Sequence, residues 1–209
     1  MRPLTRMALA LLAGMLLLAL IIVLVLPGPA PRSGTASVSA RAGAQFDGAA
    51  LPTTVAAPSF SLLDLGGRRV TLRAQRGAVT VLAFLYSHCG APCIVIAQQI
   101  RGALDQLARP PHVLIVSADP SSDTAASVRR FLAQVSLTGR ASYLTGPPGG
   151  LRRIWRAYRV TPAAAGAAAF ARAAFVLLID PRGRERVLFG PEQLTPEGLA
   201  HDIGLLQGG

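Results

Sequence analysis

The chain contains two cysteines, Cys89 and Cys93, whose types and spacing can support redox or metal chemistry. They follow an apolar run rich in β-branched residues, residues 79–85, which predicts a buried strand. Apolar residues then recur at helical spacing over residues 96–107. The pair therefore lies in a strand-to-helix turn, where unpaired N–H groups and the helix dipole favour a thiolate. Because thiolates attack disulfides and bind soft metals, the motif predicts a reactive dithiol.

A purely structural disulfide is the alternative interpretation of the two cysteines. Cysteine number and spacing alone do not separate it from a reactive pair. In an oxidising compartment the pair persists as a disulfide in either case. The remaining sequence has to distinguish the two interpretations.

The N-terminal part of the sequence predicts a membrane anchor, residues 1–26. Residues 7–26 are an unbroken apolar run preceded by Arg2 and Arg6, and a helix of this length spans a hydrocarbon core of roughly 30 Å. The flanking charges predict that the N-terminus stays inside and that the rest of the chain is periplasmic or extracellular. A cleaved signal peptide, with cleavage within residues 36–40, is the alternative. The anchor is favoured because signal h-regions are usually about 7–15 residues long.

Residues 27–57 are rich in Pro, Gly, Ala and Ser and predict a flexible linker. Residues 58–209 then form the predicted domain. It opens with a hairpin, residues 60–64 and 69–72, around Gly66-Gly67. Further predicted strands are residues 112–117, 141–144, 175–179 and 185–189, and further helices are residues 124–135, 150–158 and 195–206. This alternation predicts an α/β fold with a mostly central sheet covered on both faces.

The chain has a formal net charge of +11, which comes from arginines without any lysine. Arg152, Arg156 and Arg159 share one helix face, which predicts a solvated surface. Contact with anionic lipid or with an acidic partner is the alternative. Aromatic residues are too few and too poorly interleaved with arginine for base stacking, so no nucleic-acid partner is predicted.

Four stretches in this order resemble the SCO/SenC family of thioredoxin-fold proteins: residues 84–89 with Cys93, residues 117–124, 144–146 and 177–183. That family assembles the copper centre of cytochrome c oxidase. The resemblance implies a thioredoxin-like fold and a membrane-anchored copper metallochaperone. It also implies that Cys89 and Cys93 bind copper and form a redox-active disulfide. The implied partner is a cytochrome c oxidase subunit or another periplasmic copper or thiol protein.

One family feature is missing, since the family's third copper ligand is a histidine that precedes the strand ending in Ile179. The aligned residue here is Arg172, and no histidine lies between His112 and His201. A guanidinium stays protonated and cannot donate a lone pair to a metal. Cu(I), which accepts two thiolates, is therefore expected to bind in preference to Cu(II). Gly90 and Ile94 also depart from the family, which usually has proline after each cysteine.

His88, adjacent to Cys89, is the best substitute for the third ligand or a proton acceptor. His112 is predicted to be a core or surface residue, and His201 lies in the terminal helix. Asp119 and Asp123 could form an acid–base pair or a hard-cation site. A strand-ending turn at Asp119 and a helix cap at Ser122 or Asp123, with loop shaping near the dithiol, is the simpler interpretation.

Arg172 also supports a second function, because a fixed positive charge near two sulfurs stabilises thiolates and opposes cation binding. The chain would then be an enzyme, a thiol–disulfide oxidoreductase that reduces the cysteines of a partner's metal site. A redox or copper sensor without turnover is a third possible function. A peroxidase is not indicated, because Tyr86 stands where a Thr-x-x-Cys motif would need threonine.

Overall fold

The structure, a computed structural model, describes residues 46–208. The predicted anchor and most of the predicted linker lie outside these residues. Among the described helices, none has the length and apolar character needed to cross a bilayer.

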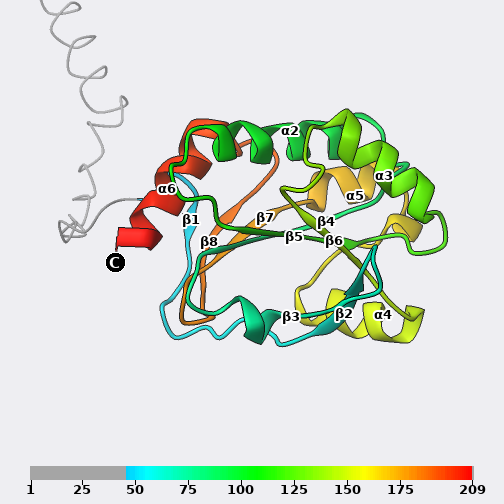
Figure 1. Cartoon of the computed structure of the whole chain (residues 1–209), viewed down its shortest axis with the longest axis horizontal. Coiled ribbons are helices and arrows are strands. Elements are labelled where there is room, and N and C mark those ends of the chain that lie inside the picture. Colours follow the sequence, from blue (N-terminus) through cyan, green and yellow to red (C-terminus); the bar gives the residue numbers. More distant parts are fainter. Residues whose placement is uncertain (1–45, 209) are drawn as a thin grey trace, which may run out of the picture. The chain divides into compact units, whose positions relative to one another are not determined.

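The described residues form one mixed sheet of eight strands (Figure 1). Its central strand β4 (Thr80–Leu85) pairs in parallel with β5 (His112–Ser117) and antiparallel with β7 (Val176–Ile179). The other strands, in sheet order, are β1 (Ala49–Ala50) and β8 (Glu185–Phe189) beyond β7, and β6 (Ser142–Thr145), β2 (Ser61–Asp64) and β3 (Arg69–Thr71) beyond β5. Because β4 and β5 are parallel, the loops that follow them emerge at the same edge of the sheet.

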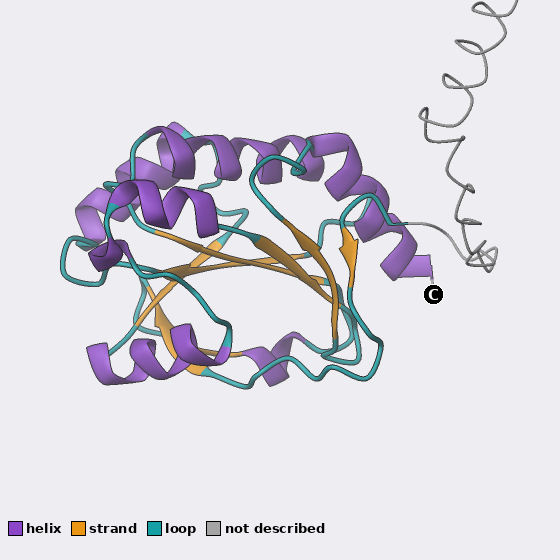
Figure 2. Ribbon diagram, turned by 180° about the vertical axis from the view of Figure 1, so that it is seen from behind, coloured by secondary structure: helices purple, strands orange, loops and turns teal. Residues whose placement is uncertain are grey.

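Helices cover both faces of the sheet, as the sequence predicts (Figures 1 and 2). One face carries α2 (Ala91–Asp105), α3 (Ala125–Gln134), α5 (Ala167–Ala173) and α6 (Pro196–Gly208). The other face carries α4 (Pro148–Ala157) and the short helix η1 (Leu72–Gln75). A second short helix, η2 (Ala163–Ala165), precedes α5. The alanine-rich residues 163–174 are therefore mostly helical, as the high helix propensity of alanine indicates.

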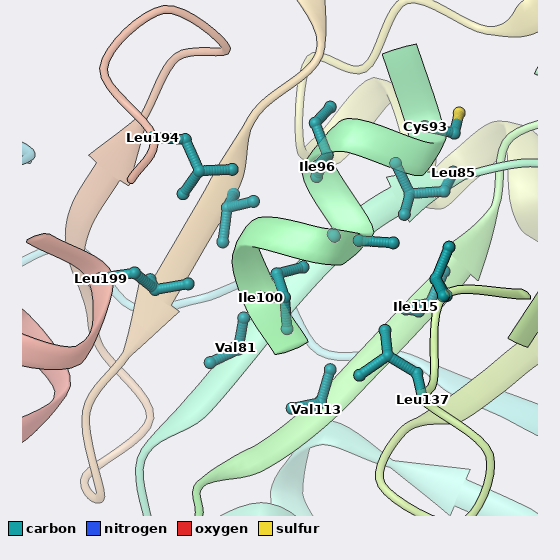
Figure 3. Packing of buried hydrophobic residues seen from close by; sticks show 14 of the residues in the cluster. Val81, Leu85, Cys93, Ile96, Ile100, Val113, Ile115, Leu137, Leu194 and Leu199 are labelled. Carbon is teal, nitrogen blue, oxygen red and sulfur yellow. The ribbon is translucent and has the colours of Figure 1, made fainter. Parts of the chain in front are cut away.

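Strand β4 is buried on both faces, which explains its continuous apolar sequence. Its residues Val81, Ala83 and Leu85 face the cluster beneath α2, and Leu82 and Phe84 face the cluster above α4. Figure 3 shows how the side chains of α2 lie against β4 in the first cluster. Two apolar layers thus hold the strand that leads into the cysteine turn.

The folded domain begins before the predicted boundary at Pro58. Ala49 and Ala50 pair with Leu188 and Val187 of β8, and the Leu51 amide donates to the Arg186 carbonyl at 2.8 Å. The end of the predicted linker is therefore part of the sheet. Two alanines carry no strand signal of their own, and the exposed edge of β8 supplies the hydrogen-bonding partner.

Candidate dithiol site

Cys89 and Cys93 lie on the turn between β4 and α2 and form a disulfide, with an S–S distance of 2.00 Å. The turn leaves β4 after Leu85, and the Cys89 amide donates to the Tyr86 carbonyl at 3.2 Å. Cys93 lies in the first turn of α2. The strand-to-helix placement predicted for the pair is confirmed.

Gly90 is the residue that lets the chain turn into α2. Its backbone angles, φ 73° and ψ −147°, lie in a region that is essentially restricted to glycine. Its carbonyl accepts the Ile94 amide at 3.2 Å, and Pro92 lies in the first helical turn, where proline is well tolerated. Proline at position 90 is incompatible with this φ. Glycine is therefore the residue that suits this turn, and Ile94 packs against the core.

Replacing Gly90 by alanine is expected to lower the free energy of unfolding of the oxidised protein by about 1–3 kcal/mol, because the Cβ strains this conformation. Gly204→Ala in α6 is the matched control, since its added methyl meets open space, and we expect it to be neutral or stabilising. The midpoint of unfolding in guanidinium chloride is measured for both variants. An unchanged midpoint for Gly90→Ala would contradict the strained turn.

The two sulfurs differ in exposure. Cys93 is fully buried, with 0% of its surface exposed, whereas Cys89 is 8% exposed. Figure 3 shows Cys93 beside Leu85, at the end of α2 that lies nearest the turn. A reagent from solvent therefore has more access to Cys89 than to Cys93.

Asp123 holds the backbone of the turn from the neighbouring loop. Its Oδ1 accepts the Ser87 amide at 2.7 Å, and its Oδ2 accepts the hydroxyls of Ser117 at 2.6 Å and Tyr143 at 2.5 Å. Ser87 lies two residues before Cys89, so this carboxylate fixes the backbone that leads into the disulfide. The predicted loop-shaping role of Asp123 is confirmed.

The predicted helix cap at Ser122 or Asp123 is wrong by one or two residues. Thr124 caps α3, because its Oγ1 accepts the Ser127 amide at 3.1 Å. Asp123 is engaged by Ser87 instead. Thr195 caps the first turn of α6, with its Oγ1 accepting the Gly198 amide at 3.1 Å.

Asp119 forms the predicted turn after β5. Its carboxylate accepts the Ser121 amide at 3.2 Å and the Ser122 hydroxyl at 2.7 Å. Burial raises the pKa of Asp119, but these hydrogen bonds outweigh burial, so the pKa lies below its ordinary value. Asp119 is therefore a turn-forming carboxylate and is poorly suited to act as a general acid.

Tyr86 connects the turn to α5. Its ring packs edge-on against Phe170, with 5.0 Å between the ring centroids. Burial raises the pKa of the Tyr86 phenol, and the carboxylates of Asp119 and Asp123 raise it further. The phenol is therefore neutral at physiological pH. No local sequence pattern identifies Phe170 as a neighbour of the turn.

His88 is exposed, and its Nδ1 lies 3.0 Å from the Ser87 Oγ. Within residues 46–208, no His, Cys, Asp or Glu side chain completes a three-ligand set with the two sulfurs. His112 is an exposed residue at the start of β5, and His201 lies in α6 beside Asp202. The structure thus does not bring a histidine to the disulfide.

Arg172 is exposed in the last turn of α5. The preceding residue, Ala171, lines a cavity of about 300 Å³ together with Ala91 and Pro92 of the first turn of α2. The segment that carries Arg172 therefore lies across this cavity from the start of the cysteine helix.

The family model for SCO1/SenC matches residues 49–206. The chain belongs to the SCO1/SenC family. A curated relative, Protein SCO1 homolog 1, mitochondrial, of Arabidopsis thaliana, is 31% identical over 107 residues. This match covers 48% of the chain and 31% of the relative, so the chain spans about a third of that relative's length.

Two solved structures illustrate the shared fold. Copper-bound ScoI of Bradyrhizobium japonicum is 26% identical with a TM-score of 0.54, covering 72% of this chain and 98% of that one. The structure of BsSco, described as a member of the Sco family of cytochrome c oxidase assembly proteins with a disulfide switch, is 16% identical with a TM-score of 0.62. It covers 76% of this chain and 96% of that one. The described domain therefore has a thioredoxin-like fold with a mixed sheet flanked by helices.

Proposed function

We propose that this protein is a copper metallochaperone that helps to assemble the copper site of cytochrome c oxidase. Cys89 and Cys93 are the donors for Cu(I), which is its cargo. The observation that carries the proposal is the position of both sulfurs on one turn, in a chain of the SCO1/SenC family. Relatives in the same family include copper-bound ScoI and an oxidase assembly protein.

The donor set suits the reduced ion. Cu(I) is soft and accepts two thiolates, whereas Cu(II) needs imidazole or harder donors. Among the described residues, no His, Asp or Glu side chain joins the two sulfurs as such a third donor. The disulfide must first gain two electrons from an external dithiol, which gives the two thiols that bind the ion.

The cellular setting follows from the sequence. Residues 7–26 anchor the protein in the membrane, and the dithiol domain lies on the extracytoplasmic side. The partner is a cytochrome c oxidase subunit or another periplasmic copper or thiol protein. In this setting the pair alternates between disulfide and dithiol.

Anaerobic titration of the reduced full-length chain with Cu(I) tests the proposal. We expect tight binding of one Cu(I) per chain, and loss of this binding in Cys93→Ser, because one thiolate remains. Asp105→Asn, on the far end of α2, is a control that leaves both donors in place. Absence of Cu(I) binding by the unmodified reduced chain would contradict the metallochaperone.

A thiol–disulfide oxidoreductase is the second candidate, and the missing third ligand favours it. One thiolate of the reduced pair would attack a client disulfide and release one client sulfur as a thiolate. The other cysteine would then attack the mixed disulfide and release the second client sulfur. The client gains two electrons and this chain becomes the disulfide. Fast reduction of a model disulfide without Cu(I) binding would support this candidate.

Restoring the missing ligand is a further prediction. Arg172→His is expected to raise the affinity of the reduced chain for Cu(II) by at least about tenfold, equivalent to about 1.4 kcal/mol. Ala168→His, also exposed on α5, controls for an added imidazole elsewhere. Competition titration with a chelator measures both affinities. A change of less than about twofold for Arg172→His would contradict the assignment of position 172 to the family's ligand.

A further inference from the structure

A groove of about 830 Å³ lies between the loop after β5 and helix α4. One wall consists of Ala118, Asp119, Pro120 and Ser121, and the other includes Arg152, Trp155 and Arg156. The indole of Trp155 is half-buried, and its Nε1 donates to the Ser117 carbonyl at 3.0 Å. The indole is therefore held in place as one side of the groove.

The groove carries positive charge that the fold leaves unpaired. Arg152, Arg153 and Arg156 line it and are exposed, and none has a carboxylate partner within 4.0 Å in the described residues. Asp119 is the one carboxylate among the lining residues, and hydrogen bonds from Ser121 and Ser122 occupy it. Three guanidinium groups thus remain free to bind anions.

The loop after β5 links the groove to the dithiol site. Ala118 and Asp119 line the groove, while Asp123 of the same loop accepts the Ser87 amide beside the cysteine turn. Both sites therefore lie at the carboxyl ends of β4 and β5. A client segment in the groove therefore contacts the loop whose Asp123 also holds the cysteine turn.

We propose that the groove between α4 and the loop after β5 docks an acidic, extended peptide segment of the client protein. The carboxylates of the segment bind Arg152 and Arg156, and its apolar side chains contact Trp155 and the prolines of the groove. The concave shape and the apolar lining favour a peptide over a broad anionic membrane surface. The inference deepens the proposed function and rests on it for the existence of a client.

Trp155 is the chain's single tryptophan, so intrinsic fluorescence reports directly on the groove. The probe is an acetylated, amidated peptide of alternating Glu and Leu, added to the oxidised full-length chain in non-ionic detergent. We expect a saturable change in Trp155 emission that weakens as salt is added. The same peptide with Gln in place of Glu is expected to bind at least about tenfold more weakly.

Arg152→Gln/Arg156→Gln is expected to weaken binding of the Glu peptide by about tenfold. Arg129→Gln/Arg130→Gln is the matched control, because it removes the same charge from exposed positions of α3 that do not line the groove. We expect less than about a twofold effect for the control. Equal losses in the two double variants would assign binding to net charge and overturn the proposal.

Two other outcomes overturn the proposal: equal binding of the Glu and Gln peptides, or no response of Trp155 to either. If phosphatidylglycerol in mixed micelles changes Trp155 emission and the Glu peptide does not, the groove binds lipid. That result would also overturn the proposal. The oxidised protein is used throughout, so the result is independent of Cu(I) binding. Intact Cu(I) binding without peptide binding rejects the docking groove alone, and the reverse result rejects the copper function alone.

Discussion

The Cys93→Ser variant is expected to form a stable mixed disulfide with an activated disulfide reagent, whose S–S bond breaks and releases a thiolate, at a rate at least about 100-fold above that of Cys89→Ser. The reason is access, because 8% of the Cys89 surface is exposed whereas none of the Cys93 surface is. An attacking thiol must approach the sulfur along the S–S axis of the disulfide that it breaks. We expect a retained Cys89 to meet the reagent sooner, because it has the larger exposed surface.

The measurement is the appearance of the mixed disulfide by intact mass after reaction of each native variant with a dithiopyridine reagent. Repetition in denaturant is the control, since both variants should then react at similar rates. Equal rates in the native proteins would contradict the greater accessibility of Cys89.

Asp123→Ala is expected to lower the free energy of unfolding by about 2–4 kcal/mol. The substitution removes the acceptor of the Ser87 amide and of the Ser117 and Tyr143 hydroxyls. Tyr143 is buried, and its hydroxyl then keeps only the Leu85 carbonyl, at 3.1 Å, as a partner. Burial and the Asp123 carboxylate raise the pKa of Tyr143, so its hydroxyl stays protonated and loses its charged acceptor in the variant.

Denaturant unfolding of the oxidised protein measures this effect. Asp119→Ala is the control, because its hydrogen bonds lie within its own partly exposed turn, and we expect a loss below about 1 kcal/mol. Asp123→Asn should recover part of the stability, since the amide oxygen can still accept one hydrogen bond. A loss for Asp123→Ala no larger than that of Asp119→Ala would contradict the role of Asp123 beneath the turn.

The sequence was sufficient to predict the central features of the fold. Residues 79–85 and 112–117 read as buried strands because both of their faces are apolar, and the structure confirms them as β4 and β5. The apolar strand pattern before the cysteines and the helical pattern after them likewise predict their position between β4 and α2. Local patterns are enough to predict these strands, because the apolar residues of each segment indicate its burial.

The features that the sequence could not predict depend on contacts between distant segments. The contact between Tyr143 and Asp123 joins residues 20 apart, and the packing of Tyr86 on Phe170 joins two segments on opposite sides of β5 in the chain. Both follow from the pairing of strands that bring these segments together. The acidic residues after β5 did carry a usable signal, because the loops after two neighbouring parallel strands meet at one edge of the sheet.

The central claim is that Cys89 and Cys93 form a disulfide that opens reversibly in the folded protein and exposes a reactive thiol. Its most direct test is intact-mass counting of alkylated cysteines in the native full-length chain, before and after mild dithiol reduction. We expect no adducts before reduction, and rapid modification of Cys89 followed by slower modification of Cys93 after it. If the reduced cysteines react only after the chain is denatured, the disulfide is purely structural. That result would contradict reversible opening in the folded protein.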